Sequence, residues 1–287
     1  MLPTFGFRHM GILYIVPTPL GNLEDITLRA LRILAKVTLI ATEDTRTSGR
    51  LLKHFGLSCP LVSYHDHSQQ DRLERVLTAL EQGDVALVSE AGTPLLSDPG
   101  YKLVRAAIER GIRVVTLPGP SAITAALTVS GLPTDRFMFL GFLPRKRGER
   151  RRALAEVEPV QATLLFFEAP HRVREALKDL LEVLGGERAV AICRELTKLH
   201  EEVWRGSLAE AHKVWSERSP RGEFTLVVSG ALPHPAWDER RVKQQLVEAL
   251  NSGMTAKDAV RMVTDWSGWP KREVYTLVQE LDNRPER

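Results

Sequence analysis

The sequence is poor in cysteine and has no long apolar run, and each absence excludes a class of protein. Cys59 and Cys193 are the only cysteines among 287 residues, and they do not form a Cys-x-x-Cys pair. Neither a disulfide framework nor a zinc finger is therefore supported. The longest apolar runs, such as ATLLFF at 162–167, are far shorter than the roughly 20 residues that a membrane-spanning helix needs. The N-terminus lacks the apolar core of a signal peptide, so we expect a cytoplasmic protein with no membrane partner.

What is present is the composition of an ordinary globular protein, with 43% hydrophobic and 26% charged residues. A chain of 287 residues favours two domains and a small appendage. The net charge is only +3, but the run RKRGERRR at 145–152 gathers arginines and a lysine around a single glutamate. This run is either a solvated surface or, if it lies beside a substrate site, a set of phosphate contacts.

Short apolar runs alternate with helical patterns in the first part of the chain. The predicted buried strands are 11–16, 37–41, 85–89 and 112–117. Between them, two segments have apolar residues at helical spacing, 28–35 and 73–83. This alternation predicts a mostly parallel sheet with helices on its faces. The pattern breaks at TLPGPSA (116–122), where two prolines and a glycine predict a hinge between domains.

A second α/β domain and a helical tail follow. The predicted strands of this domain are 137–142, 162–167, 189–193 and 224–229. Its predicted helices are 171–184 and 207–216. In the tail, one amphipathic helix stops at Gly253, a second starts after Thr255 and a third starts at Pro270. Three short helices suggest a helix-turn-helix-like module. Acidic and basic residues balance in it, so it is no electrostatic DNA clamp, and packing, dimer stabilisation and nucleic-acid binding all remain open.

The stretch VALVSEAGTPLLSDPG (85–100) joins a predicted strand to a predicted helix. Asp98 before Pro99 has the form of an N-cap and a first-turn proline, which predicts a helix over about 99–110. Gly92 allows a ligand to approach the backbone closely, and Thr93 and Pro94 stiffen the turn. Ligands of open α/β sheets bind outside the carboxyl ends of strands, so this loop is a candidate binding site.

The loop PTPLGN (17–22) follows the first predicted strand and falls at the same edge of the sheet. It lacks both the P-loop pattern and the dinucleotide-binding pattern of glycines, which argues against a nucleoside triphosphate or NAD. Two proline-stiffened loops without lysine fit a zwitterionic, partly apolar ligand that is recognised through backbone groups. S-adenosylmethionine is such a ligand.

Charged residues follow the strand at 37–41, in the stretch ATEDTR. Asp44 and Arg46 could simply belong to the first turn of a helix, where the helix dipole favours acidic groups. They could also lie at the ligand edge, Asp44 as a base or polar anchor and Arg46 as a phosphate contact. The spacing does not decide between these interpretations.

The stretch FFEAPHR, with Glu168 and Arg172, again ends a predicted strand and opens a predicted helix, so capping and function compete equally. His65 and His67 have the spacing of a metal-ligand pair, but no further ligand cluster matches them. We therefore predict no metal site.

Eight motifs in order resemble the tetrapyrrole methylase superfamily, and within it the branch of bacterial 16S rRNA cytidine 2′-O-methyltransferases. They are PTPLGNLEDIT, EDTR, SEAGTPLLSDPG, LPGPSA, GFLPRK, FFEAPHR, RELTKLHEE and GEFTLVVSG, between about Met10 and Gly230. The resemblance implies a two-domain α/β fold, usually a homodimer, with S-adenosylmethionine in the cleft between the domains and a small helical module at the C-terminus. The boundaries that we expect are an N-terminal extension at 1–9, α/β domains at 10–118 and 119–232, and the tail at 233–287.

The resemblance also implies roles for particular residues. The expected cofactor contacts are Pro17, Gly92, Thr93, Pro94, Ser121, Ala122, Phe142, Glu168, Ala169, Glu223 and Leu226. The first candidate for the catalytic base is Asp44, and the second is Glu90. Arg46 is also expected in the catalytic site, as a phosphate contact. The expected contacts to RNA phosphates are Arg145, Lys146, Arg147 and Arg172.

The implied reaction moves a methyl group to the ribose 2′-hydroxyl of a cytidine in the decoding region of 16S rRNA, within the small ribosomal subunit. A 2′-hydroxyl acceptor requires RNA, so DNA is not an expected partner. Two alternatives remain. One is a methyltransferase of the same fold that acts on a porphyrin-like precursor, and the other is a non-catalytic ligand sensor that regulates a helix-turn-helix reader.

Overall fold

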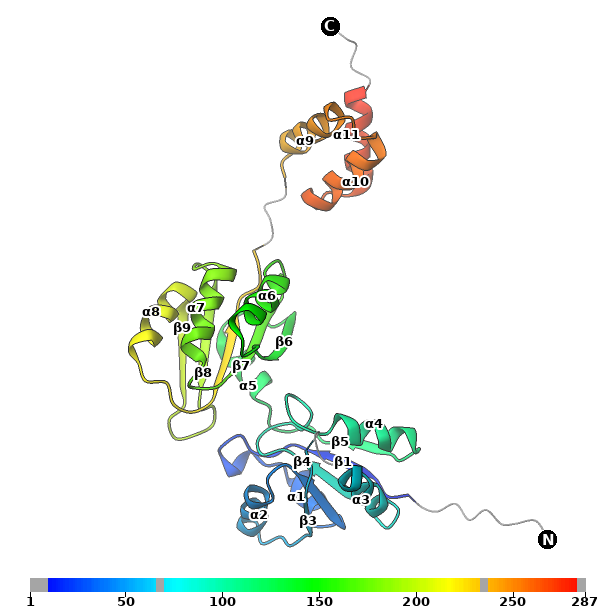
Figure 1. Cartoon of the computed structure of the whole chain (residues 1–287), viewed down its shortest axis with the longest axis vertical. Helices are drawn as coiled ribbons and strands as arrows, with labels where there is room; N and C mark the ends of the chain where they lie inside the picture. The colour runs from blue at the N-terminus through cyan, green and yellow to red at the C-terminus, as the bar shows by residue number, and fades with distance from the viewer. Residues whose placement is uncertain (1–9, 66–69, 233–236, 283–287) are drawn as a thin grey trace, which may run out of the picture. The chain divides into compact units, whose positions relative to one another are not determined.

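The computed structural model describes residues 10–65, 70–232 and 237–282. The chain forms two compact units, Met1–Gly230 and Ala231–Arg287. The first unit contains two five-stranded sheets, and the second contains helices in its described residues (Figure 1). This is the α/β class with a small C-terminal helical module that the sequence predicts. The N-terminal extension at 1–9 lies outside the described residues, and the boundary at 118 stays a prediction.

The first sheet is parallel throughout. Its strands, in spatial order, are β3 (Leu61–Ser63), β2 (Leu39–Thr42), β4 (Val85–Val88), β1 (Leu13–Val16) and β5 (Val114–Thr116). Every residue of β2 and β4 is buried, because helices cover both faces of the sheet, and this explains the continuous apolar runs.

The helices divide evenly between the two faces of this sheet. α3 (Gln70–Leu80) and α4 (Tyr101–Glu109) pack in one apolar cluster, whereas α1 (Leu28–Leu34) and α2 (Thr45–His54) pack in the other. A single 3-10 turn, Leu23–Asp25, precedes α1. The loops after β1, β2 and β4 therefore emerge together at one edge, as the parallel order requires.

The second sheet is mixed. Its spatial order is β6 (Phe137–Phe142), β7 (Thr163–Glu168), β10 (Phe224–Val228), β8 (Ala189–Arg194) and β9 (Glu202–Ser207), and only β6 and β7 run parallel. One face is covered by α5 (Ala122–Ser130), and the other by α6 (Arg147–Val157), α7 (Val173–Leu184) and α8 (Leu208–Glu217).

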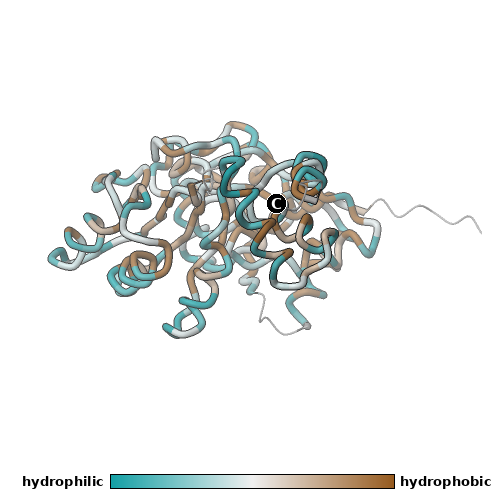
Figure 2. The backbone as a smooth tube through the Cα atoms, turned by 90° about the horizontal axis from the view of Figure 1, so that it is seen from above, coloured by the Kyte–Doolittle hydropathy of each residue, from teal (hydrophilic) through white to brown (hydrophobic). Residues whose placement is uncertain are grey.

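The second unit holds α9 (Glu239–Asn251), α10 (Ala256–Ser267) and α11 (Lys271–Asp282), which share one apolar cluster. Thr255 caps α10 by accepting a hydrogen bond from the Asp258 backbone N–H at 3.2 Å. Brown and teal segments alternate along the helices in Figure 2, as expected for helices with one buried face. No helix in the described residues is both long and apolar enough to span a membrane.

The predicted cap of α4 is wrong. The helix begins at Tyr101, and Gly100 occupies the N-cap position with a φ of +137° and no side-chain capping bond. Leu95 and Ser97 have φ values of +73° and +69°, so the chain turns twice before the helix. Asp98 is consequently directed toward Ser89 and the edge of the sheet instead of the helix end.

Candidate functional site

A cavity of about 300 Å³ lies in the first unit, beyond the carboxyl end of β4. We call it the first cavity. Both sheets contribute to it, through the loop after β4, the start of α5 and the ends of β6, β7 and β10. Its lining residues are Leu20, Glu90–Thr93, Leu96–Asp98, Ser121–Ile123, Phe142, Phe167–Pro170 and Glu223–Thr225.

Backbone groups join the loops after β1 and β4 into one wall. Thr18 N–H donates to Gly92 O at 2.9 Å, and Gly92 N–H donates to Thr18 O at 2.8 Å. Gly92 has a φ of +80°, and a Cβ there would lie 3.0 Å from a methyl group of Leu20. A side chain at this position would therefore strain the turn and press on the opposite loop.

The segment that connects the two sheets closes this wall. Thr93 Oγ1 donates to Pro120 O at 2.9 Å. Gly119 packs so tightly on Pro17 that a Cβ would lie 2.8 Å from the proline Cβ. Pro17 thus supports the connecting segment from behind.

The structure brings most of the expected cofactor residues to the first cavity. Pro17 and Pro94 do not line it but are buried beside it, and the Leu226 side chain belongs to the apolar cluster under α7 and α8. Thr225 faces the cavity instead, because alternate residues of a strand point to opposite faces. The expected residues that line the cavity are Gly92, Thr93, Ser121, Ala122, Phe142, Glu168, Ala169 and Glu223. Their binding roles remain predictions.

The residues that sequence reasoning missed are mostly apolar or lie in neighbouring positions of the same motifs. Leu20, Ile123, Phe167 and Phe224 line the first cavity, and Phe142 packs edge-to-face on Phe167 with ring centres 5.7 Å apart. Their signal in the sequence is that of ordinary core residues.

Acidic side chains dominate the polar lining. Glu90, Asp98, Glu168 and Glu223 face the first cavity, and none of its lining residues, all in the described part of the chain, is a lysine or arginine. Burial raises the pKa of Asp98 to about 6, and the neighbouring carboxylates, Glu43 foremost, add to this. Burial also raises the pKa of Glu90, again with help from Glu43. The cavity therefore favours a cationic ligand, which would relieve this repulsion.

Asp44 and Arg46 behave as the first turn of α2. The Asp44 carboxylate accepts hydrogen bonds from the Arg46 backbone N–H at 2.8 Å and from Thr47 Oγ1 at 3.2 Å. The backbone hydrogen bond is the main reason why the pKa of Asp44 is lowered, which weakens it as a base. Neither residue lines the first cavity, whereas Glu90 does.

A second cavity, of about 260 Å³, adjoins the first. It lies between α2 and the loop after β1, and it shares Leu20 and Glu90 with the first cavity. Its lining residues are Thr18–Gly21, Leu23, Thr47, Ser48, Arg50, Leu51, Ser89 and Glu90.

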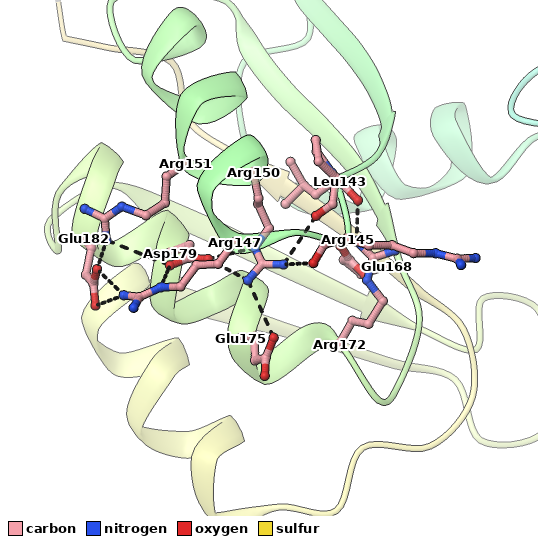
Figure 3. A network of polar contacts seen from close by, with 11 residues as sticks. Leu143, Arg145, Arg147, Arg150, Arg151, Glu168, Arg172, Glu175, Asp179 and Glu182 are labelled. Carbon is pink, nitrogen blue, oxygen red and sulfur yellow. Dashed lines mark hydrogen bonds and ion pairs between the residues drawn. The ribbon is translucent and has the colours of Figure 1, made fainter.

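Three arginines of the basic run at 145–152 form ion pairs with α7, and one of them, Arg150, is buried (Figure 3). Arg150 and Asp179 are 2% and 1% exposed, and Arg150 Nε donates to Asp179 Oδ2 at 2.7 Å. Arg147 Nε donates to Asp179 Oδ1 at 3.1 Å, and both Arg147 and Arg151 pair with Glu182. Arg150 Nη2 also lies 3.6 Å from Glu175 Oε2, so three arginines of the run pair with three carboxylates of α7.

The remaining expected RNA contacts differ in exposure. Arg145 and Lys146 are exposed, and Lys146 pairs with the surface residue Glu149, at 3.0 Å. Arg172 is largely buried, with Nη2 bonded to Leu143 O and 3.2 Å from Glu168 Oε1. Arg172 therefore holds the end of β6 next to the first cavity, and its charge is less available to a ligand.

His65 lies 3.7 Å from a carboxylate oxygen of Glu43, through Nδ1, and His67 lies outside the described residues. Across 10–65, 70–232 and 237–282, no group of three or more potential ligand side chains could hold a metal ion.

Known proteins resemble this chain along most of its length. The family model of tetrapyrrole (corrin/porphyrin) methylases matches residues 12–212. Two proteins named ribosomal RNA small subunit methyltransferase I are similar to it. The one from Synechocystis sp. is 45% identical over 276 residues, covering 95% of this chain and 99% of that protein. The one from Pseudomonas aeruginosa is 50% identical over 271 residues, covering 92% and 95%.

A solved structure shares the fold at much lower sequence identity. The uroporphyrin-III C-methyl transferase of Thermus thermophilus, complexed with S-adenyl homocysteine, is 19% identical with a TM-score of 0.55, covering 76% of this chain and 97% of that one.

Proposed function

Because this chain belongs to the family of tetrapyrrole (corrin/porphyrin) methylases, we propose that it transfers a methyl group from S-adenosylmethionine to the ribosomal RNA of the small subunit. The observation that carries this proposal is the identity of 45–50% with rRNA small subunit methyltransferases over nearly the whole chain. We propose further that the acceptor is the 2′-hydroxyl of a cytidine in the decoding region of 16S rRNA.

The first cavity fits S-adenosylmethionine in charge and shape. The cofactor carries a sulfonium, an ammonium and one carboxylate, so its net charge is positive. The cavity offers Glu90 and Asp98, which have no ion-pair partner among the described residues, and Glu223, which pairs with Lys198 at 3.0 Å. Phe142 and Phe167 supply an aromatic wall for the adenine, and a volume of about 300 Å³ is typical of small-ligand pockets. When bound, S-adenosylmethionine supplies an electrophilic methyl group on its sulfonium sulfur.

Within this scheme Glu90 is the better candidate for the general base. It lines both cavities, and its raised pKa makes it a stronger proton acceptor than the capped carboxylate of Asp44. In the proposed step the 2′-hydroxyl loses its proton to Glu90 as its oxygen forms a bond to the methyl carbon and the carbon–sulfur bond breaks.

The same charges disfavour a porphyrin-like substrate. Such precursors carry several carboxylates, which Glu90 would repel where the acceptor meets the first cavity. Within the second cavity Arg50 is the one basic lining residue. We propose that exposed Arg145 and Lys146, rather than Arg147 and Arg172, contact RNA phosphates outside the two cavities.

We also propose that the protein acts as a homodimer in the cytoplasm, where ribosomal subunits mature. β6 is an edge strand of its sheet, and Phe137 and Met138 on it are 46% and 37% exposed. Exposed apolar side chains on an unpaired strand edge favour association with a second copy. Light scattering of the purified protein measures this directly.

The test of the function is methyl transfer to defined substrates. Purified protein is incubated with radiolabelled S-adenosylmethionine and, separately, small ribosomal subunits, naked 16S rRNA and a porphyrin-like precursor. We expect label in RNA and a cytidine linkage that resists alkaline hydrolysis. Label only in the porphyrin-like compound contradicts the proposal, and cofactor binding without transfer supports the ligand-sensor alternative.

The cofactor site has a matched pair of glycines for its own test. Gly92 and Gly56 have φ values of +80° and +65°, but only a Cβ at Gly92 would meet another loop, whereas nothing lies within 4 Å at Gly56. In both alanine variants the positive φ strains the backbone and lowers stability by about 1 kcal/mol. We expect calorimetry to show a loss of S-adenosylmethionine affinity of tenfold or more for Gly92→Ala only. Equal affinities of the two variants would place the cofactor elsewhere.

A further inference from the structure

The second cavity lies where an acceptor would have to approach a methyl donor bound in the first. The two cavities meet at Leu20 and Glu90, which belong to both. A ligand in each cavity would therefore contact the same carboxylate from either side. This arrangement suits a transfer reaction in which the acceptor loses its proton at the junction.

The lining of the second cavity combines apolar faces with few available polar groups. Leu20, Leu23 and Leu51 form the apolar part. Ser48 Oγ and Ser89 Oγ are already committed, to Thr42 Oγ1 at 2.6 Å and to Gly92 O at 2.9 Å. These hydroxyls thus stabilise the walls and leave recognition to other groups.

The polar groups that remain are a guanidinium and backbone donors. Arg50 is exposed and has no ion-pair partner among the described residues, in contrast to Arg147 and Arg151 of α6. The backbone N–H groups of Leu20 and Gly21 donate no hydrogen bond within the described part of the chain. An arginine beside free amides is a suitable environment for a phosphate or a base carbonyl.

Arg46 extends this positive side. It lies four residues before Arg50 on α2, so both side chains leave the same face of the helix. The Arg46 side chain is 87% exposed, and its Nε lies 3.6 Å from Asp44 Oδ1. A chain of phosphates that runs along α2 would meet the two guanidinium groups in succession.

We propose that the second cavity is the acceptor pocket of the enzyme, and that it takes one unstacked nucleotide of the substrate RNA. This proposal rests on the proposed function. Leu20, Leu23 and Leu51 contact the faces of the base, Arg50 binds the flanking phosphate, and the ribose lies at Glu90. A volume of about 260 Å³ admits a single nucleoside and no duplex, so the target nucleotide must leave its stack to enter.

The test compares two basic residues of the same helix. Arg50→Ala removes the lining cation, and Lys53→Ala removes an exposed lysine of α2 that does not line the second cavity. We expect Arg50→Ala to raise KM for small subunits about tenfold, to leave S-adenosylmethionine affinity unchanged, and to reduce the slope of log affinity against log salt by about one. Lys53→Ala should match the wild type in all three measurements.

A second variant tests the pocket by filling it. Leu23 lines the second cavity but not the first, and it is 37% exposed, so Leu23→Trp leaves the core intact. We expect this variant to bind S-adenosylmethionine normally and to lose methyl transfer at least tenfold. Wild-type kinetics of both Arg50→Ala and Leu23→Trp would overturn the acceptor pocket and leave the proposed function standing. A wild-type protein that methylates neither form of the RNA would overturn the proposed function, and the pocket with it.

Discussion

Two charged regions of the first unit look alike in the sequence but are used in opposite ways by the fold. In α6, Arg147, Arg150 and Arg151 point to Glu175, Asp179 and Glu182 of α7, and the three positive charges meet three negative ones (Figure 3). At the junction of the two cavities, Glu90 has no ion-pair partner among the described residues, and Arg50 stands apart from it. Of the other carboxylates of the first cavity, Asp98 is likewise unpaired there, whereas Glu168 and Glu223 pair with Arg172 and Lys198 at 3.2 and 3.0 Å.

The comparison teaches where charge is available for chemistry. A paired and buried charge fixes the position of an element, and removing one partner is costly because the other stays buried. Carboxylates that have no basic partner repel one another, which raises their pKa values and destabilises the fold. A cationic ligand that binds between them removes this repulsion. The α6–α7 contact therefore reads as structural, whereas the junction reads as functional.

The largest effect is expected at the junction. Glu90→Gln removes the proposed base and should lower kcat by about 10²- to 10⁴-fold, with little change in S-adenosylmethionine affinity. In the wild type, kcat should fall as the pH drops through the raised pKa of Glu90, because the base must be ionised. Single-turnover methyl transfer across a pH series measures both effects.

The matched control for Glu90 is Asp44, the other candidate base. Asp44→Asn keeps an efficient N-cap on α2 but removes the carboxylate. We expect its kcat to stay within a few-fold of the wild type. A loss as large as that of Glu90→Gln would return the role of the base to Asp44.

The next effect is expected in the paired region. Asp179→Ala removes the buried carboxylate that lies 2.7 Å from the buried guanidinium of Arg150 and leaves the exposed Glu175, at 3.6 Å, as its ion-pair partner. It should lower the free energy of unfolding by about 3–5 kcal/mol. Glu182→Ala removes a partly exposed partner and should cost less than about 1 kcal/mol. Urea denaturation distinguishes the two. Similar losses in both variants would show that burial does not determine how much an ion pair contributes to the free energy of unfolding.

A smaller effect of opposite sign is expected at Asp98. Its pKa is raised from 3.8 to about 6, so the folded state binds the proton more tightly than the unfolded state. The wild type therefore loses stability as the pH rises between these values, and the full cost is present above pH 6. Asp98→Asn should raise stability at pH 7.5 by about 1–2 kcal/mol, because solvent screens this partly exposed group, with a smaller gain at pH 5.

Thermal unfolding at the two pH values tests Asp98 against a surface control. Asp71→Asn removes an exposed carboxylate of α3 and should show no such pH-dependent gain. Lower stability of Asp98→Asn than of the wild type at pH 7.5 would mean that the Asp98 carboxylate stabilises the loop after β4.

The smallest effect concerns RNA affinity at the basic run. Arg145→Ala should weaken binding to small subunits a few-fold and reduce the salt slope by about one, because Arg145 is exposed and unpaired among the described residues. Arg147→Ala should leave both quantities unchanged, since Asp179 and Glu182 already neutralise that charge. Equal salt slopes for the two variants would remove the distinction between paired and open arginines.

Much of the fold follows from local patterns. The apolar runs at 85–89 and 224–229 are strands almost to the residue, and the three tail helices form as their spacing predicts. Strand β3 has three residues, and β9 is only partly buried, so neither presents a continuous apolar run to detect. Periodicity is a property of neighbours in the chain, and it reports an element only if one face is consistently buried.

The candidate site was predictable as a set of loops but not as a set of side chains. The motifs around Gly92, Ser121 and Glu168 converge on the first cavity as expected. Asp98 resembled a helix cap, and the positive φ angles of Leu95 and Ser97 that redirect it leave no clear mark in the sequence. Leu226 and Thr225 exchange roles, because the face of a strand is set by the register of the whole sheet.

By itself, then, the sequence determined the class of fold, the family and the loops that meet at one sheet edge, because these depend on short-range patterns and ordered motifs. The tertiary structure alone decided which charged side chains form ion pairs and which remain available to a ligand. Arg150 meets Asp179 from 29 residues away, and Glu90 receives its electrostatic environment from Glu43 and Glu223, far along the chain on either side. The energy of a charge depends on burial and on neighbours in space, and a linear sequence specifies neither until it has folded.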